Sequence, residues 1–261
     1  MKKRKYLALL LAAGMIAQTA LSTGGVVQVQ AAEDTYVKTD ELTDNDTAAP
    51  KKDSVIPSKN QYEYQKQELA AFCHFGMNTY TGSEWGNGKE NPNQFQLTND
   101  FDEETYVKAI HDAGFKKLII TAKHHDGFCI WPSEMTTHDT ETAGYEGDVL
   151  EELSRACTKY NIDMGLYLSP WDVNSEYYGY KDKDGKKLVG ADGQPLNGKT
   201  WDQVKQEDAL DYNEYYDNQL KEILGNDKYG NNGHFKEVWM DGAKDTNDKS
   251  NAQDYDFQRW F

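Results

Sequence analysis

Cysteine is scarce in this sequence, and its spacing argues against a disulfide framework or a zinc centre. Only Cys73, Cys129 and Cys157 occur among 261 residues. A chain of this length can bury a core without disulfides, and small disulfide-rich domains need a much denser framework. Cys73 lies in an apolar run and Cys157 on a predicted helix face, so we expect buried free thiols. No Cys or His spacing typical of a metal site is present.

The sequence also has few positive charges and no glycine-rich phosphate loop. Lys and Arg number 28 against 44 Asp and Glu, which gives a formal net charge of −16. Such an acidic chain repels nucleic acid and anionic membrane surfaces, so we expect neither as a partner. No G-x-G-x-x-G run follows the first predicted strand, which argues against a dinucleotide fold.

The N-terminal segment has the pattern of a secretory signal peptide. Lys2 to Lys5 are basic, and Tyr6 to Ala20 are mostly apolar but too few for a comfortable membrane span. Small residues at the expected positions predict cleavage after Ala31, with an uncleaved anchor as the alternative. Since no Cys is near, a lipid anchor is not expected. We therefore predict a signal peptide over residues 1–31, a flexible leader over 32–57, a domain over 58–261, and secretion.

Short apolar runs and helical patterns alternate through the domain. Four β-α units in series require parallel strands joined by right-handed crossovers. The cap residues Ser58 and Asp148 mark two helix starts. Strands are predicted at 70–76, 117–122, 162–169 and 235–240, and helices at 60–69, 103–113, from 149, at 211–224 and from 255.

Two α/β architectures fit this order, an open doubly wound sheet and a (β/α)8 barrel. Polar and aromatic residues gather at the carboxyl end of every predicted strand, where barrels hold their active sites. We therefore predict a (β/α)8-type barrel with about the first four units present. Half a barrel would leave open sheet edges, so the sequence as printed is expected to be inactive alone.

An insertion is expected at Glu176 to Gln206. Its Asp184-Gly185 and Asp192-Gly193 pairs are typical of hairpin turns. Because it follows a strand, it could shape a pocket, and a surface decoration is an equal alternative.

Asp241 is the strongest candidate for a functional side chain. It ends the run Trp239-Met240-Asp241-Gly242 after a buried strand. A buried carboxylate is costly unless it is paired or functional, and Gly242 leaves space above it. A capping or turn aspartate is the alternative.

Two further segments offer groups that suit a hydroxylated ligand. His124 and His125 are neighbours, and neighbouring strand residues point to opposite faces, so they are not expected to chelate one ion. One ring facing the pocket could bind hydroxyl groups, while a core histidine is the alternative. Trp85 beside Glu84 would add a stacking surface and a carboxylate.

Four segments together resemble the α-L-fucosidases of glycoside hydrolase family 29. The resemblance runs from about Pro57 to Phe261, with the motifs in order and sensibly spaced. The Glu-Trp-Gly sequence at the end of the first motif is similar to that of the family branch that prefers α-1,3 and α-1,4 fucosyl linkages. The segments are His74 to Gly86 (HFGMNTYTGSEWG), Lys123 to Pro132 (KHHDGFCIWP), Gly165 to Asp172 (GLYLSPWD) and Glu237 to Gly242 (EVWMDG).

The resemblance implies a retaining exo-glycosidase that removes terminal α-L-fucose from oligosaccharides or glycoconjugates. Asp241 would be the nucleophile, and the acid/base carboxylate would lie beyond Phe261. No metal or cofactor is implied, because two carboxylates perform the reaction. The residues that would line the fucose pocket are His74, Glu84, Trp85, His124, His125, Tyr167 and Trp239. A non-catalytic sugar-binding barrel and a barrel glycosidase for another sugar are the alternatives.

Overall fold

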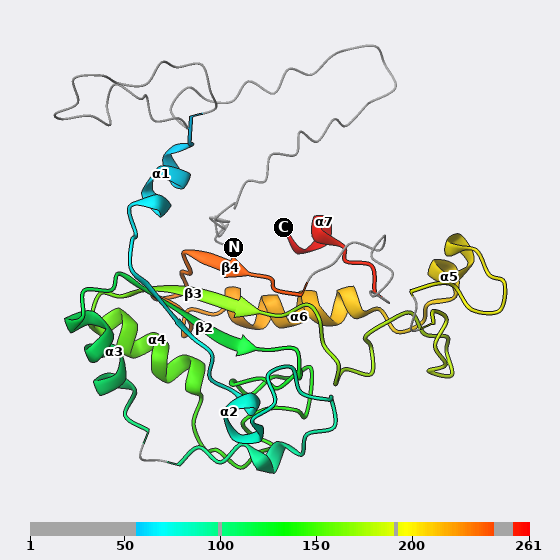
Figure 1. Ribbon diagram of the computed structural model, residues 1–261, viewed down its shortest axis with the longest axis horizontal. Coiled ribbons are helices and arrows are strands. Elements are labelled where there is room, and N and C mark those ends of the chain that lie inside the picture. The colour runs from blue at the N-terminus through cyan, green and yellow to red at the C-terminus, as the bar shows by residue number, and fades with distance from the viewer. Residues whose placement is uncertain (1–55, 99–100, 191–192, 243–252) are drawn as a thin grey trace, which may run out of the picture. The chain divides into compact units, whose positions relative to one another are not determined.

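The computed structural model describes residues 56–98, 101–190, 193–242 and 253–261 (Figure 1). The predicted signal peptide and residues 32–55 of the predicted leader lie outside these ranges. The chain divides into two units, Met1–Glu68 and Leu69–Phe261. In the first unit, α1 (Lys59–Gln65) starts one residue before the predicted start and ends four residues before the predicted end, and Ser58 caps it as predicted, since its Oγ accepts a hydrogen bond from Gln61 N at 3.2 Å.

The second unit is built on a four-stranded parallel sheet with the strands in chain order. This confirms the predicted α/β class and the parallel pairing. The same strand order occurs in the wall of a (β/α)8 barrel. The closed barrel stays a prediction. The strands are β1 (Ala70–Cys73), β2 (Lys117–Lys123), β3 (Asp163–Leu168) and β4 (Glu237–Trp239).

Three helices follow the first three strands and begin at aspartate caps. They are α3 (Glu103–Asp112), α4 (Val149–Lys159) and α6 (Tyr212–Leu224). The carboxylates of Asp102, Asp148 and Asp211 accept bonds from backbone N–H groups of the first turn. These acceptors satisfy donors that the helix leaves unpaired, so the caps fix where each helix starts.

The insertion contains the predicted hairpin and a helix that was not predicted. Antiparallel bridges pair Lys181 with Lys187 and Val189 with Pro195. A small core of Tyr180, Leu188, Val189 and Val204 packs with Trp201. The helix of the insertion is α5 (Trp201–Glu207). The periodicity also missed two short elements, α2 (Met77–Thr81) and η3 (Pro92–Gln94), while α7 (Phe257–Trp260) begins two residues after the predicted start.

The three cysteines are free, as predicted. Cys129 and Cys157 are buried, whereas Cys73 is half-buried. Within the described part of the chain, no helix is long and apolar enough to span a bilayer.

The two faces of the sheet differ in chemistry. One face carries Leu118, Ile120 and Leu166, which belong to the buried core that also contains residues of α3, α4 and α6. The opposite face carries Tyr167 and Trp239, which pair across β3 and β4. Since side chains alternate along a strand, the alternation that places Trp239 on this second face continues to Asp241.

A β-bulge at the end of β2 interrupts the alternation. The register with β3 shifts between Thr121 and Lys123, and bulges of this kind redirect side chains beside functional sites. Lys123 turns toward α6, where its Nζ lies 5.4 Å from the ring centre of Tyr215 and 5.2 Å from that of Tyr216. Its ammonium group donates to Gln219 Oε1 at 2.7 Å.

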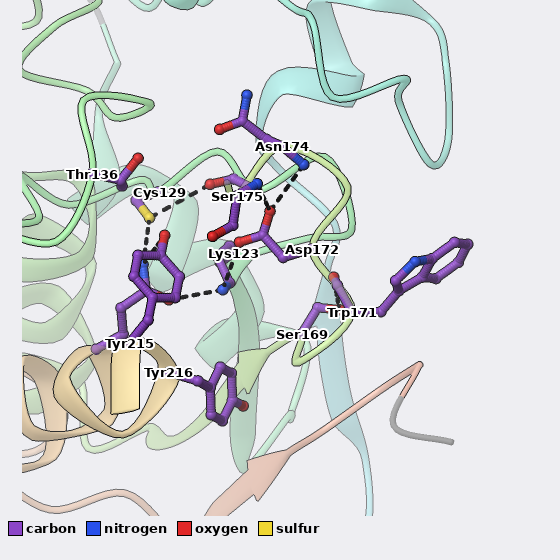
Figure 2. Close-up of polar contacts among 12 residues, drawn as sticks. Lys123, Cys129, Thr136, Ser169, Trp171, Asp172, Asn174, Ser175, Tyr215 and Tyr216 are labelled. Carbon is purple, nitrogen blue, oxygen red and sulfur yellow. Dashed lines mark hydrogen bonds and ion pairs between the residues drawn. The ribbon is translucent and has the colours of Figure 1, made fainter. Parts of the chain in front are cut away.

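The partner of this ammonium group is Asp172 (Figure 2). Lys123 Nζ lies 3.1 Å from Asp172 Oδ2, and both side chains are almost fully buried. Asp172 Oδ1 accepts bonds from Asn174 N at 3.0 Å and Ser175 N at 2.8 Å. The pair therefore joins the end of β2, the segment after β3 and α6.

Lys123→Met is predicted to destabilise the protein strongly, because it leaves the Asp172 carboxylate buried without its counter-charge. Breaking a buried pair in this way costs about 3–5 kcal/mol. The free energy of unfolding is measured by urea denaturation of the full-length product of the gene that contains this sequence, hereafter the full-length protein. The control, Lys159→Met, removes an exposed partner of Glu104 and should change nothing measurable. Equal midpoints for the two variants would contradict the prediction.

Candidate active site

Asp241 lies directly after β4 with its side chain half exposed, at 52%. Its Oδ2 accepts a hydrogen bond from the Tyr167 hydroxyl at 2.9 Å, and its Oδ1 accepts one from Gly242 N at 2.8 Å. Burial, and then the bond to Asp241, raise the pKa of Tyr167. The phenol therefore stays protonated and donates. Each carboxylate oxygen has one donor, and the group still faces solvent.

His125 is the second group beside this carboxylate. Its Nε2 lies 3.9 Å from Asp241 Oδ2, and its Nδ1 lies 2.7 Å from Ser169 Oγ. Burial lowers the pKa of His125, against the smaller opposing effects of the Asp241 charge, a hydrogen bond to the Trp171 backbone and the Glu84 charge. The imidazole is therefore neutral at neutral pH.

His124 is also part of the site. Its ring stacks on Tyr167 at a centroid distance of 5.4 Å and an angle of 3°. His74 meets it edge-on at 5.6 Å. Burial first, and then the neighbouring His125 and His74, lower the pKa of His124 to about 4.

The prediction that the two histidines point to opposite faces is wrong. Their ring centroids are 4.2 Å apart. The physical reason is that β2 ends at Lys123 after the bulge, so strand alternation does not continue through His124 and His125.

Three more predicted pocket residues, His74, Trp85 and Trp239, gather around these groups, and the charge of Glu84 acts on His125. Trp239 is 44% exposed and meets Phe72 edge-on at 5.3 Å, while His74 stacks on Phe72 at 4.7 Å. Trp85 is 55% exposed and packs against Trp171 at 5.7 Å. The result is a set of partly open aromatic surfaces around the Asp241 carboxylate, and sugars commonly stack on such surfaces.

Two residues at the site had no role assigned from the sequence. The Trp171 ring packs on His125 at 4.6 Å, and Ser169 Oγ lies 2.7 Å from Trp171 O and 3.1 Å from Asp241 O. The only sequence signal was their position at the carboxyl end of a predicted strand. Figure 2 shows Asp172 turned toward Lys123 and Trp171 turned the other way.

Among the described residues, no group of three or more His, Cys, Asp or Glu side chains could hold a metal ion. The groups at the site are instead a carboxylate, imidazoles, a phenol and indoles. They suit nucleophilic attack and hydrogen bonding to a polyhydroxylated ligand.

A family model described as α-L-fucosidase matches residues 58–260. The chain belongs to this family. The resemblance found in the motifs is thereby confirmed.

Similar proteins come from plants, animals and bacteria. The curated α-L-fucosidase 1 of Arabidopsis thaliana is 40% identical over 209 residues, covering 79% of this chain and 34% of the relative. The tissue α-L-fucosidase of Homo sapiens is 29% identical over 132 residues, covering 41% and 28%. A structure of a Ruminococcus gnavus GH29 fucosidase in complex with fucose is 56% identical, with a TM-score of 0.68.

The chain spans only part of these fucosidases. The match with the Ruminococcus gnavus fucosidase covers 87% of this chain and 43% of that chain. Against the Arabidopsis fucosidase it spans about a third of the relative's length, at 34%.

Gly242→Ala tests how tightly the site is packed. A Cβ at Gly242, where φ is +75°, would lie 2.9 Å from His125 Cε1 and from Trp171 Cβ. A Cβ at Gly144, where φ is +83°, meets nothing within 4 Å. Both alanines carry the left-handed strain of about 1–2 kcal/mol, and Gly242→Ala should cost about 1–3 kcal/mol more through overpacking. Equal losses in urea denaturation would contradict this packing.

The lowered pKa of His124 predicts a pH-dependent stability. The folded state takes up this proton less readily than the unfolded chain between about pH 6.5 and pH 4. The contribution of neutral His124 is complete above about pH 6.5 and is lost as the pH falls through about 4. Burial raises the pKa of Asp126 to about 7, so its protonation stabilises the folded state as the pH falls and opposes the effect of His124. The stability of the wild type must therefore be compared with that of a variant that lacks only the His124 imidazole.

The wild type should therefore lose more stability between about pH 7 and pH 4 than His124→Gln, which has no imidazole to protonate. Thermal unfolding of the full-length protein across this range measures the difference. Parallel curves for the two proteins would show that His124 does not titrate as described.

Proposed function

We propose that the full-length protein is a retaining α-L-fucosidase with Asp241 as its nucleophile. One observation carries the proposal: a half-exposed carboxylate lies at the carboxyl end of β4, oriented by two hydrogen-bond donors. The family to which the chain belongs supports the sugar, and the strand-end position is where barrel enzymes place catalytic groups.

The proposed reaction has two steps. An oxygen of Asp241 attacks the anomeric carbon of fucose as the bond to the leaving oxygen breaks, giving a fucosyl ester and an alcohol. Water then cleaves the ester with net retention. Tyr167 and Gly242 each donate one bond to the carboxylate, so they fix its plane while lone pairs remain for attack.

A second carboxylate must protonate the leaving oxygen and then activate the water. In retaining enzymes it lies about 5–5.5 Å from the nucleophile. We propose that it lies beyond Phe261, as the resemblance implies. The chain's coverage of 43% of the Ruminococcus gnavus fucosidase is compatible with that position.

The groups around Asp241 are proposed to bind the fucose ring. Trp239 and Trp85 offer exposed indole faces for the apolar side of a sugar. The imidazoles of His74, His124 and His125, together with the Glu84 carboxylate, suit hydroxyl groups. The Ruminococcus gnavus structure, described as a complex with fucose, supports this choice of sugar.

The proposal extends to the fucosyl linkage that is cleaved and to the location of the protein. We propose α-1,3 and α-1,4 fucosyl linkages on branched glycans, and secretion by the N-terminal signal peptide. Rates on fucosyl oligosaccharides of each linkage, and N-terminal sequencing of the exported protein, would test them. Faster cleavage of α-1,2 or α-1,6 linkages would contradict the linkage.

Asp241→Ala in the full-length protein should abolish fucose release from an aryl α-L-fucoside, since the ester cannot form. The fold should survive, because the side chain is half exposed. The control is Asp163→Ala, at the start of β3 and so at the opposite end of the sheet, which should keep its activity. Normal turnover by Asp241→Ala would rule out this residue as the nucleophile.

The wild-type protein distinguishes the alternatives in the same assay. Fucose binding by calorimetry without any hydrolysis would identify a non-catalytic sugar-binding protein. A preference for an aryl galactoside over the fucoside would identify a glycosidase for another sugar.

A further inference from the structure

Ser169 lies where three segments of the site meet. The residue is fully buried and follows β3 directly. Its Oγ contacts His125 Nδ1 from the segment after β2 at 2.7 Å, Trp171 O at 2.7 Å, and Asp241 O after β4 at 3.1 Å. One hydroxyl group therefore links the residue beside the proposed nucleophile to the backbone of the nucleophile itself.

The chemistry of these contacts fixes where the protons are. Both carbonyl oxygens can only accept, so Ser169 can bond to the ring and to a carbonyl at the same time only when its single proton goes to the carbonyl. The short contact with His125 is then a hydrogen bond only if Nδ1 carries a proton and donates it to Oγ. In the neutral ring that carries its proton on Nδ1, Nε2 has a free lone pair.

We infer that Ser169 is a positioning residue that holds His125 in the Nδ1–H tautomer and presents Nε2 as a hydrogen-bond acceptor beside Asp241. The inference rests on the proposed function and specifies it further. The bound sugar would donate one of its hydroxyl protons to Nε2, which lies 3.9 Å from Asp241 Oδ2. The other tautomer would present an N–H to the sugar, and the single Ser169 proton could then bond either Nδ1 or a carbonyl oxygen but not both.

The surroundings of His125 support a role for this one bond. The charged and titratable groups that act on the ring are Asp241, Glu84 and His74, and the His124 ring lies against it. The Trp171 ring packs on it at 4.6 Å, and Gly242 leaves room for it. These contacts restrict the plane of the ring. The Trp171 backbone is a second hydrogen-bond partner of the ring, and its carbonyl oxygen also contacts Ser169 Oγ, so both partners lie on the Nδ1 side.

Ser169→Ala in the full-length protein tests the role. The hydroxyl is lost, so kcat/KM for an aryl α-L-fucoside should fall by about 100-fold, the loss that follows a misplacement of about 1 Å at an active site. Ser169→Thr keeps the hydroxyl and should recover most of the activity. The control is Ser154→Ala, a buried serine in α4 that donates to Leu150 O at 2.6 Å, which should leave kcat/KM unchanged.

A second measurement reports the tautomer directly and separates positioning from general destabilisation. Long-range ¹H–¹⁵N spectra of the protein with ¹⁵N-labelled histidine, assigned with His125→Gln, show which ring nitrogen carries the proton. We expect Nδ1–H in the wild type and a mixture in Ser169→Ala. An Nε2–H wild-type ring, or full activity in Ser169→Ala, would overturn the inference.

Failure of the proposed function gives a different result. A wild-type protein that releases no fucose contradicts the fucosidase proposal, and the role of Ser169 in that reaction with it. An active wild type with an unaffected Ser169→Ala variant contradicts only the inference about Ser169.

Discussion

The buried ion pair between Lys123 and Asp172 is the contact on which the arrangement of this site depends. Two opposite charges lie 3.1 Å apart with almost no exposure to solvent. Neither charge could be held there without its partner, because removing a single charge from water is costly. The remaining polar atoms are used as well: Gln219 accepts from the ammonium group, and two backbone N–H groups donate to the carboxylate.

The position of this pair in the chain gives it consequences beyond stability. Lys123 is followed directly by His124 and His125, and Asp172 directly follows Trp171. Holding the two charges together therefore holds the two segments that carry site residues together. The bulge at Lys123 turns the charge toward α6, and the same bulge brings both imidazoles to the side of Tyr167.

The division of the sheet into two faces explains why the site can be both well packed and open. The face toward the helices is apolar, and its side chains pack in the buried core with residues of α3, α4 and α6. The other face ends in Tyr167, Trp239 and Asp241, whose packing is aromatic and whose carboxylate remains half exposed. A rigid scaffold with an accessible carboxylate is the arrangement that preorganised catalysis requires.

Local features of the sequence were sufficient for most of the elements and for the position of Asp241 at the end of a strand. Short apolar runs located β1 to β4, and the capping residues Ser58 and Asp148 located two helix starts. The histidine pair was misinterpreted because a bulge depends on pairing with β3, which no local pattern encodes.

Tertiary contacts explain the other omissions. Lys123 and Asp172 are 49 positions apart, and Ser169 and Asp241 are 72 apart. The two residues of each pair come into contact only when the strands that precede them are aligned in the sheet. For the pocket residues, the motifs predicted which side chains would gather, whereas the geometry shows how His124 stacks and which atom of His125 faces Asp241.

The central claim is that Asp241 forms a covalent bond to fucose, and trapping that bond tests it most directly. The full-length protein would be treated with 2-deoxy-2-fluoro-α-L-fucosyl fluoride, whose fluorine slows hydrolysis of the ester, and its peptides analysed by mass spectrometry. The account predicts one fucosyl label on the peptide that contains Asp241 and no label in Asp241→Ala. A label on another carboxylate, or turnover with inversion and no label, would contradict it.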